Sequence, residues 1–219
     1  MNQKTKHIFG TFIVLIPVFV VLALWLAMAP ISSRIVDLST LFLSLGRISG
    51  LLGLSLYALS LILHIRIKFL KKLFLDGAYI CKLHHELGSY ALILLLIHPL
   101  AFAIRFANFD SYYAARFLLP FDNLVNLAGF VALLIMIVAL VVTYYYNKNH
   151  SLWLWAHRAM LVAYAGAFLH LFFVSSDTSV NPILKYYMIL LMAAGLLAFA
   201  YQRLSRYFPE SEKRIEVCE

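Results

Sequence analysis

Five histidines lie in two strongly apolar stretches of the sequence, where an imidazole does nothing for membrane insertion. His84, His85 and His98 belong to the first stretch, and His157 and His170 belong to the second. An ionisable side chain within a membrane span is costly and usually has a function. Neutral imidazole nitrogens bind transition metals, and haem iron in electron carriers commonly takes one nitrogen from each side of the porphyrin plane. The five histidines therefore suggest ligands of a metal or of haem iron.

The spacing of these histidines is nearly the same in both stretches. His84 and His98 are 14 residues apart, which on a helix is a rise of about 21 Å with both rings within about 40° of one face. His157 and His170 are 13 residues apart, and on an ideal helix their rings diverge by about 140°. Two such helices side by side, running in the same direction, would pair His84 with His157 and His98 with His170. Each pair would supply the two axial ligands of one haem.

Two details of this pattern stay open at the level of sequence. Spacing alone does not settle the choice between His84 and His85, because His85 also lies 13 residues before His98, although a common face favours His84. The divergence in the second stretch predicts either a helix irregularity near Gly166 or different ring directions at the two sites. We expect Gly88 and Gly166 to let a flat macrocycle approach the backbone.

Membrane-spanning helices are required to position these histidines, and the composition predicts them. The chain has 219 residues, of which 63% are hydrophobic and 13% are charged. A hydrocarbon core of about 30 Å needs about 20 helical residues. Six apolar stretches meet this requirement, near residues 8–29, 42–64, 83–104, 124–146, 153–174 and 182–203. We therefore predict an all-α integral membrane protein, a six-transmembrane-helix bundle with the histidines on spans three and five.

The distribution of lysine and arginine predicts the orientation of this bundle. Most of the 18 basic residues lie before span one, between spans two and three, around the link from span four to span five, and after span six. The positive-inside rule then gives two cytoplasmic termini and a multi-pass protein of a bacterial inner (plasma) membrane. Topology also accounts for the net charge of +8, so no nucleic-acid partner is needed.

The sequence reads as one membrane domain over residues 1–206 with a short cytoplasmic tail over 207–219. The tail contains no glycine-rich phosphate loop and is far too short for a nucleotide-binding domain. Residues 66–80 alternate basic and apolar side chains, which predicts a segment lying in the membrane interface. Residues 105–123 carry many aromatic side chains, and we interpret them as a boundary belt rather than as a cover over an outer site.

Three stretches of the sequence resemble the ferric-reductase-like transmembrane family, which includes ferric reductases and the membrane core of NADPH oxidases. They are LGRISGLLGLSLYALSL in span two, HHELGSYALILLLIHPL in span three and WLWAHRAMLVAYAGAFLH in span five. The resemblance implies two stacked b-type haems between spans three and five. It implies that His84 and His157 bind the inner haem iron and that His98 and His170 bind the outer one. It also implies that Arg47 neutralises the outer haem propionates.

Two further assignments follow the resemblance. The candidates for the inner propionates are Arg66, Lys68, Lys82 and Arg158, which the sequence does not rank. Tyr164 lies midway along span five, where it could sit between the haems, although we favour a role in core packing.

The resemblance implies electron flow from a cytosolic flavin to an acceptor of the ferric iron or oxygen type on the outer face. Phe102 stands where animal NADPH oxidases have a histidine associated with oxygen reduction, which speaks against a dedicated superoxide site. Since the sequence stops at Glu219, FAD and NAD(P)H would act only through a separate or missing domain. The chain is then a membrane oxidoreductase component that needs a cytosolic flavin reductase or dehydrogenase domain.

Three alternatives remain at this point. Two are a quinol-linked cytochrome b and the haem-binding subunit of a periplasmic methionine sulfoxide reductase system. The set of four histidines argues against the second of these, because that subfamily generally has arginine near position 84. The third, from another class, is a haem-free six-span carrier or scaffold whose histidines bind metal or relay protons.

Overall fold

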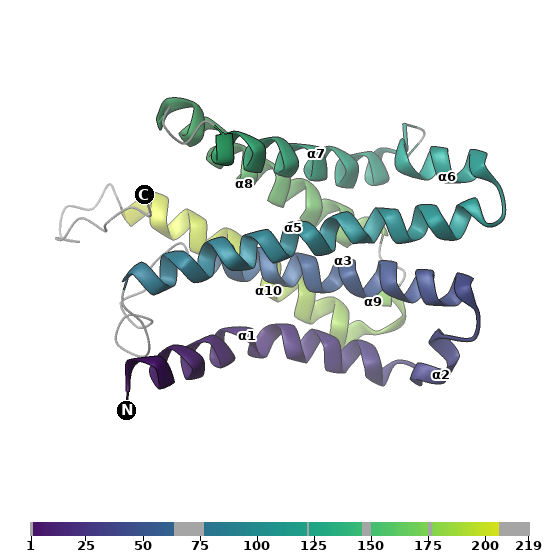
Figure 1. Ribbon diagram of the computed structural model, residues 1–219, viewed down its shortest axis with the longest axis horizontal. Coiled ribbons are helices and arrows are strands. Elements are labelled where there is room, and N and C mark those ends of the chain that lie inside the picture. Colours follow the sequence, from purple (N-terminus) through teal and green to yellow (C-terminus); the bar gives the residue numbers. More distant parts are fainter. Residues whose placement is uncertain (1, 64–76, 122, 146–149, 175–176, 206–219) are drawn as a thin grey trace.

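A computed structural model describes residues 2–63, 77–121, 123–145, 150–174 and 177–205 (Figure 1). All regular structure within these ranges is helical. Six helices are long and apolar enough to cross a membrane, which confirms the predicted six-span all-α bundle. They are α1 (Gln3–Ala27), α3 (Leu38–Leu63), α5 (Gly77–Ala107), α7 (Leu124–Tyr145), α8 (His150–Val174) and α10 (Pro182–Ser205).

Three short helices join the spans at one end of the bundle. They are α2 (Ile31–Arg34), α6 (Ser111–Leu118) and α9 (Asp177–Val180). All three lie at the end opposite to that where α1 begins and α10 ends (Figure 1). We call the end that holds these three short helices the α6 end. The predicted tail lies outside the described residues, as does most of the predicted interfacial segment 66–80.

Four of the helices that begin at the α6 end, α3, α6, α7 and α10, are preceded by a short acidic or amide side chain that caps them. Asp37 accepts from the Thr40 backbone N–H at 2.7 Å, and the Thr40 hydroxyl accepts from the Asp37 N–H at 3.0 Å. Asp110 caps α6, Asn123 caps α7 and Asn181 caps α10, each accepting from the backbone of the first turn. These side chains satisfy N–H groups that a helix start leaves unpaired. The sequence therefore fixes where these helices begin.

Two spans begin five or six residues earlier than the apolar stretches predict. α1 begins at Gln3 rather than near residue 8, and α5 begins at Gly77 rather than near residue 83. Counting apolar residues finds the part of a helix that matches hydrocarbon, whereas the helix itself can continue beyond that part, as it does through Lys4 and Lys6 in α1 and through residues 77–82 in α5. As a result, His84 lies about two turns inside α5 and not at its end.

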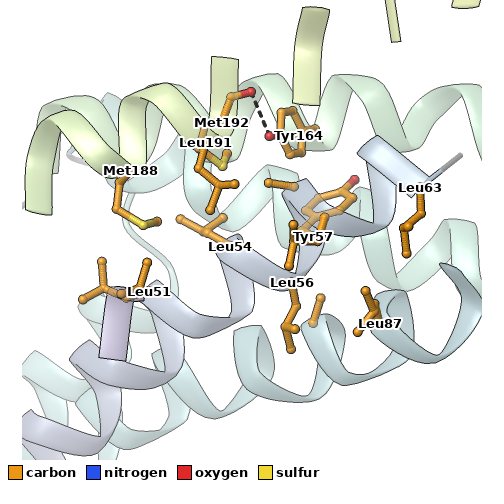
Figure 2. Close-up of a cluster of buried hydrophobic side chains, with 14 of the residues drawn as sticks. Leu51, Leu54, Leu56, Tyr57, Leu63, Leu87, Tyr164, Met188, Leu191 and Met192 are labelled. Atoms are coloured by element: carbon orange, nitrogen blue, oxygen red, sulfur yellow. Dashed lines mark hydrogen bonds between the residues drawn. The ribbon is translucent and has the colours of Figure 1, made fainter. Parts of the chain in front are cut away.

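The core of the bundle is centred on α3, which packs against α5, α10 and α1. Small residues on α3 allow α5 to come close, since a Cβ added at Gly53 would lie 2.9 Å from Leu95 Cγ. Figure 2 shows Leu54 and Tyr57 of α3 packed with side chains of α8 and α10. Tyr164 of α8 is fully buried there, and its hydroxyl donates to the Met192 carbonyl at 2.9 Å. The expected core-packing role of Tyr164 is confirmed.

The helices that carry the histidines belong to two different pairs. α3 packs along α5, and α7 packs along α8. Across the described residues, the backbones of α5 and α8 have little contact with each other. The space between the two helix pairs is where the histidine side chains meet.

Candidate functional site: two pairs of facing histidines

The structure brings the four predicted histidines together in two pairs across the space between α5 and α8. The ring centroids of His84 and His157 are 6.1 Å apart with an interplanar angle of 60°. Those of His98 and His170 are 6.3 Å apart at 82°. The cross-helix partners inferred from the 14- and 13-residue spacings are therefore the partners observed. We refer to the two arrangements as the His84–His157 pair and the His98–His170 pair.

The distance between the rings fits two ligands of one iron. A bond from a metal to an imidazole nitrogen is about 2 Å long, and the ring centroid lies roughly 1 Å farther along the same line. Two imidazoles on opposite sides of one iron therefore have centroids about 6 Å apart. Both pairs meet this distance.

Three of the four rings are oriented by a backbone carbonyl. The contacts join Nδ1 of His84 to the Ser60 oxygen (2.8 Å), Nδ1 of His98 to the Gly46 oxygen (2.7 Å) and Nδ1 of His170 to the Val125 oxygen (3.0 Å). A carbonyl can only accept, so Nδ1 carries the proton and Nε2 keeps its lone pair. Metal-ligating histidines are typically oriented in this way by a partner of the other ring nitrogen.

The fourth ring is oriented by an aromatic neighbour on its own helix. His157 stacks on Trp153, one turn earlier in α8, with centroids 5.1 Å apart and an interplanar angle of 17°. Such a stack holds the plane of the imidazole while the ring faces His84 of α5. The sequence offers a signal for it, an aromatic residue four positions before the histidine, which our sequence reasoning missed.

Glycines make room for the rings of the His98–His170 pair. A Cβ added at Gly50 would lie 2.6 Å from His98 Nδ1, and one at Gly129 would lie 2.7 Å from His170 Nδ1. Each glycine stands four residues after the residue whose carbonyl the histidine contacts. Only glycine leaves space for the ring to reach a carbonyl one turn earlier on the facing helix. Sequence reasoning missed both glycines.

The two glycines that we did select behave differently. Gly88 lines the space beside the His84–His157 pair, and an added Cβ there would meet Ser60 Oγ at an ordinary 3.6 Å. Gly166 instead lies against α7, because its Cβ would be 3.3 Å from both the Ala128 oxygen and Ala132 Cβ. Gly166 therefore serves helix packing, so the macrocycle role expected for it is wrong.

No helix irregularity accompanies the 13-residue spacing. α8 is a continuous α-helix from His150 to Val174. The two rings instead take different directions: His157 stacks on its own helix, whereas His170 reaches a carbonyl of α7. The sequence left open a helix irregularity or different ring directions, and the structure shows different ring directions.

A cavity of about 540 Å³ adjoins the His98–His170 pair. This volume is in the range of small-molecule and cofactor sites. Its wall is mostly apolar and comes from α3, α5, α6, α7, α8 and α9. The polar side chains in it include both histidines, Arg47 and Asp177.

Part of the segment 105–123 lines this cavity, a role beyond the boundary belt that the sequence suggests. Phe106, Phe117 and Pro120 all line the cavity. Phe117 of α6 lies 5.3 Å from Phe102, whose ring contacts His98 edge-on at 5.2 Å. A boundary belt and a cover over a site have the same aromatic composition, so the sequence alone does not distinguish them. The packing of α6 against α5 shows the cover.

A smaller cavity of about 110 Å³ adjoins the His84–His157 pair. Its wall includes Ser60, Thr143 and His85 as well as the pair itself. His85 is exposed, and its ring lies 5.3 Å from that of His84. The ring that faces His157 and has its Nδ1 on a carbonyl is that of His84, which agrees with the choice by common face.

Tyr57 lines both cavities. It is 4% exposed, its hydroxyl donates to the Met160 carbonyl, and its ring meets Tyr164 edge-on at 5.0 Å. The side chain between the two sites is thus Tyr57 of α3. Tyr164, the tyrosine that the sequence suggested, lies behind it in the core.

Arg47 lies where an anionic group in the larger cavity would meet it. Its Nη1 is 3.1 Å from Asp177 Oδ1, and its side chain is 34% exposed. Among the described residues, no acceptor lies within hydrogen-bond distance of its buried Nε. A guanidinium offers five donors in a planar fork, so Arg47 retains donors for a carboxylate. This observation fits a propionate-bearing group between His98 and His170.

Comparison with known proteins identifies a family match. The model described as "Ferric reductase like transmembrane component" matches residues 49–168, which is more than half of the 219-residue chain. The match contains His84, His98 and His157 and ends shortly before His170. No curated protein and no solved structure matches the chain.

Proposed function

We propose that this chain, which belongs to the family of ferric reductase like transmembrane components, carries electrons across a membrane through two b-type haems. Family membership indicates transmembrane electron transfer in general, and the six spans indicate a multi-pass membrane protein. The observation that carries the finer proposal is the facing pair of imidazoles at each site, with centroids 6.1 Å and 6.3 Å apart.

A haem bound at each pair would supply a one-electron carrier. His98 and His170 would bind one iron, and His84 and His157 would bind the other. The carbonyl partners of Nδ1 keep the Nε2 lone pairs available and raise the basicity of the imidazoles. Arg47 offers donors to a propionate at the His98–His170 pair.

The surrounding side chains separate the two sites from water and from each other. Phe102, Phe106 and Phe117 form an apolar cover at the α6 end of the larger cavity. Tyr57 closes the space between the two cavities. Exclusion of water from a site of this kind lowers the local dielectric and so strengthens the influence of nearby charges on its potential.

A bare metal ion fits these pairs less well than haem does. Protein zinc sites use three or four protein ligands. The described residues contain no group of three or more His, Cys, Asp and Glu side chains placed to bind an ion. A porphyrin brings four nitrogens of its own, so two imidazoles complete its iron. The donor set therefore favours haem over the metal-binding carrier.

The direction of transfer rests on the charge distribution. In the sequence, most basic residues lie before span one, between spans two and three, around the link from span four to span five, and after span six, which supports a cytoplasmic location for both termini in a bacterial inner membrane. Electrons would then enter from a cytosolic flavin reductase or dehydrogenase at the His84–His157 pair. They would leave from the His98–His170 pair to an external acceptor of the ferric iron or oxygen type.

Vesicles test this function directly. Purified protein is reconstituted into liposomes that enclose ferricyanide, with NADH, FMN and a flavin reductase outside. We expect reduction of the enclosed ferricyanide in wild type and in His85→Ala, and loss of this reaction in His98→Ala. Rates equal to those of protein-free vesicles in all samples would refute transmembrane electron transfer by this chain.

A further inference from the structure

The carboxylate of Asp177 lies between two other helices at the α6 end. Its Oδ2 accepts a hydrogen bond from Trp25 Nε1 of α1 at 3.0 Å, and its Oδ1 lies 3.1 Å from Arg47 Nη1 of α3. The Asp177 side chain is 11% exposed, so both contacts lie in a region of low dielectric. The start of α9 thus brings a negative charge to the wall of the larger cavity.

A second arginine lies beside this ion pair. The guanidinium of Arg34 stacks over the Trp25 ring at 3.5 Å and donates to the Trp25 and Ala29 carbonyls. Burial lowers the pKa of Arg34, the charge of Asp177 opposes this change, and the charge of Arg47 adds to it. Two cations and one carboxylate therefore share this region. Without Asp177, the positive charge at the cavity would be considerably larger.

The cluster is connected to the histidine pair through Arg47. Arg47 and Asp177 line the same cavity as His98 and His170. Trp25, Arg47 and Asp177 all lie outside residues 49–168, the segment that matches the family. The contacts among them therefore join the segments before and after the one that the family model matches.

We infer that Asp177 tunes the reduction potential of the iron held by His98 and His170, by offsetting and positioning the charge of Arg47. This inference rests on the proposed function. A reduced haem carries one positive charge fewer than an oxidised one, so a cation nearby favours the reduced form. The carboxylate of Asp177 counteracts that effect. Asp177 is a positioning residue, because it acts through Arg47 and not on the iron.

Redox titration of a protein that retains one haem tests this inference. In a His84→Ala background, we expect only the haem of the His98–His170 pair to remain, so its midpoint potential is read from absorbance alone. We expect Asp177→Asn to raise this potential and Arg47→Gln to lower it. Asp177→Glu keeps the charge and should leave the potential close to that of the background.

Asp37→Asn is the matched control. Asp37 is an exposed carboxylate at the same end of the bundle, it is absent from the wall of the larger cavity, and asparagine can still cap α3. Its variant should leave the potential unchanged. In the full chain, His84 lies about 21 Å from His98 along α5. The midpoint potential of a haem at the His84–His157 pair should therefore shift several-fold less in Asp177→Asn.

The outcomes separate the inference from the function. Equal potentials in Asp177→Asn and Asp37→Asn, with haem bound, would overturn the inference and leave the proposed function standing. Loss of haem from both Asp177→Asn and Asp177→Glu would show a structural role and also overturn it. Absence of haem from the unmodified protein would overturn the proposed function itself.

Discussion

The two histidine pairs have nearly the same ring separation but very different surroundings. The His98–His170 pair adjoins a cavity of about 540 Å³, and glycines leave space for both of its rings. The His84–His157 pair adjoins a cavity of about 110 Å³ whose wall contains hydroxyls and a third histidine. The charged groups near the two pairs differ as well, because the Arg47–Asp177 ion pair lines the larger cavity and not the smaller one.

This difference indicates that ligand geometry and cofactor environment are set by separate residues. Spacing along α5 and α8 fixes where the imidazoles meet, whereas α3, α6, α7 and the α9 segment decide how each site is enclosed. Two carriers with the same ligands can then differ in affinity and potential, because both depend on burial, hydrogen bonds and nearby charge. The following predictions test this separation.

The largest effect is expected from substitution of the glycines beside the His98–His170 pair. In Gly50→Ala the new Cβ would lie 2.6 Å from His98 Nδ1, so the ring must leave the Gly46 carbonyl. We expect loss of one of the two haems, measured by pyridine haemochrome analysis. Gly129→Ala should act in the same way through His170.

Gly88→Ala provides the matched control for these glycine variants. Its added Cβ would make only an ordinary contact of 3.6 Å with Ser60 Oγ. The imidazoles of the His84–His157 pair should therefore keep their places, and although Gly88 lines the space beside that pair, this variant should lose less haem than Gly50→Ala does. The comparison between the sites would fail if Gly88→Ala lost haem while Gly50→Ala retained both.

The rate of haem release should differ between the two pairs. The smaller cavity has room for less of a bound macrocycle than the larger one does. Transfer of haem to excess apomyoglobin should show a fast and a slow phase. His98→Ala should leave only the fast phase, and His84→Ala only the slow one; the reverse assignment would contradict the comparison.

Loss of the Trp153 stack should weaken the His84–His157 pair moderately. An aromatic contact of this kind contributes about 0.5–1.5 kcal/mol, so Trp153→Leu should bind the haem of that pair several-fold more weakly. Gel filtration followed by a reduced-minus-oxidised spectrum measures the haem retained. Trp155→Leu is the control, since Trp155 is 66% exposed and packs over Arg158. Equal haem loss in the two variants would show that the Trp153 stack does not strengthen haem binding at this pair.

The smallest effect is expected from the Ser60 hydroxyl. It lies 3.0 Å from His84 Nδ1 and donates to the His84 carbonyl, but the Ser60 carbonyl still accepts from that ring in Ser60→Ala. We expect both haems to remain, with a loss of stability of about 1 kcal/mol. Thermal unfolding in detergent measures it, with Ser55→Ala as a buried control on the same helix. Complete loss of the haem would show that the hydroxyl, not the carbonyl, orients His84.

The spans and the histidine partners were predictable because both depend on local regularities. A run of about 20 apolar residues marks a span wherever it lies in the chain. Separations of 14 and 13 residues place one imidazole towards each end of two helices that run in the same direction. The starts of α1 and α5 were not predictable in this way, since each helix begins five or six residues before its predicted apolar stretch.

The parts of the site that escaped prediction depend on partners distant in the sequence. The carbonyls that orient His84, His98 and His170 lie 24, 52 and 45 residues away. The position of Gly129 becomes meaningful only when α7 is placed beside His170, and that of Asp177 only beside Arg47. The cover formed by α6 was not predicted from the sequence for a related reason, because its aromatic residues suit a membrane boundary equally well.

Haem content is the most direct test of the central claim that each pair of histidines holds one iron. Protein purified in detergent should contain two b-type haems per chain, with a reduced spectrum typical of two histidine ligands. His157→Ala and His98→Ala should each retain one haem, and the double variant none, while His85→Ala retains both. A protein without bound haem, or single variants that keep both haems, would contradict the account.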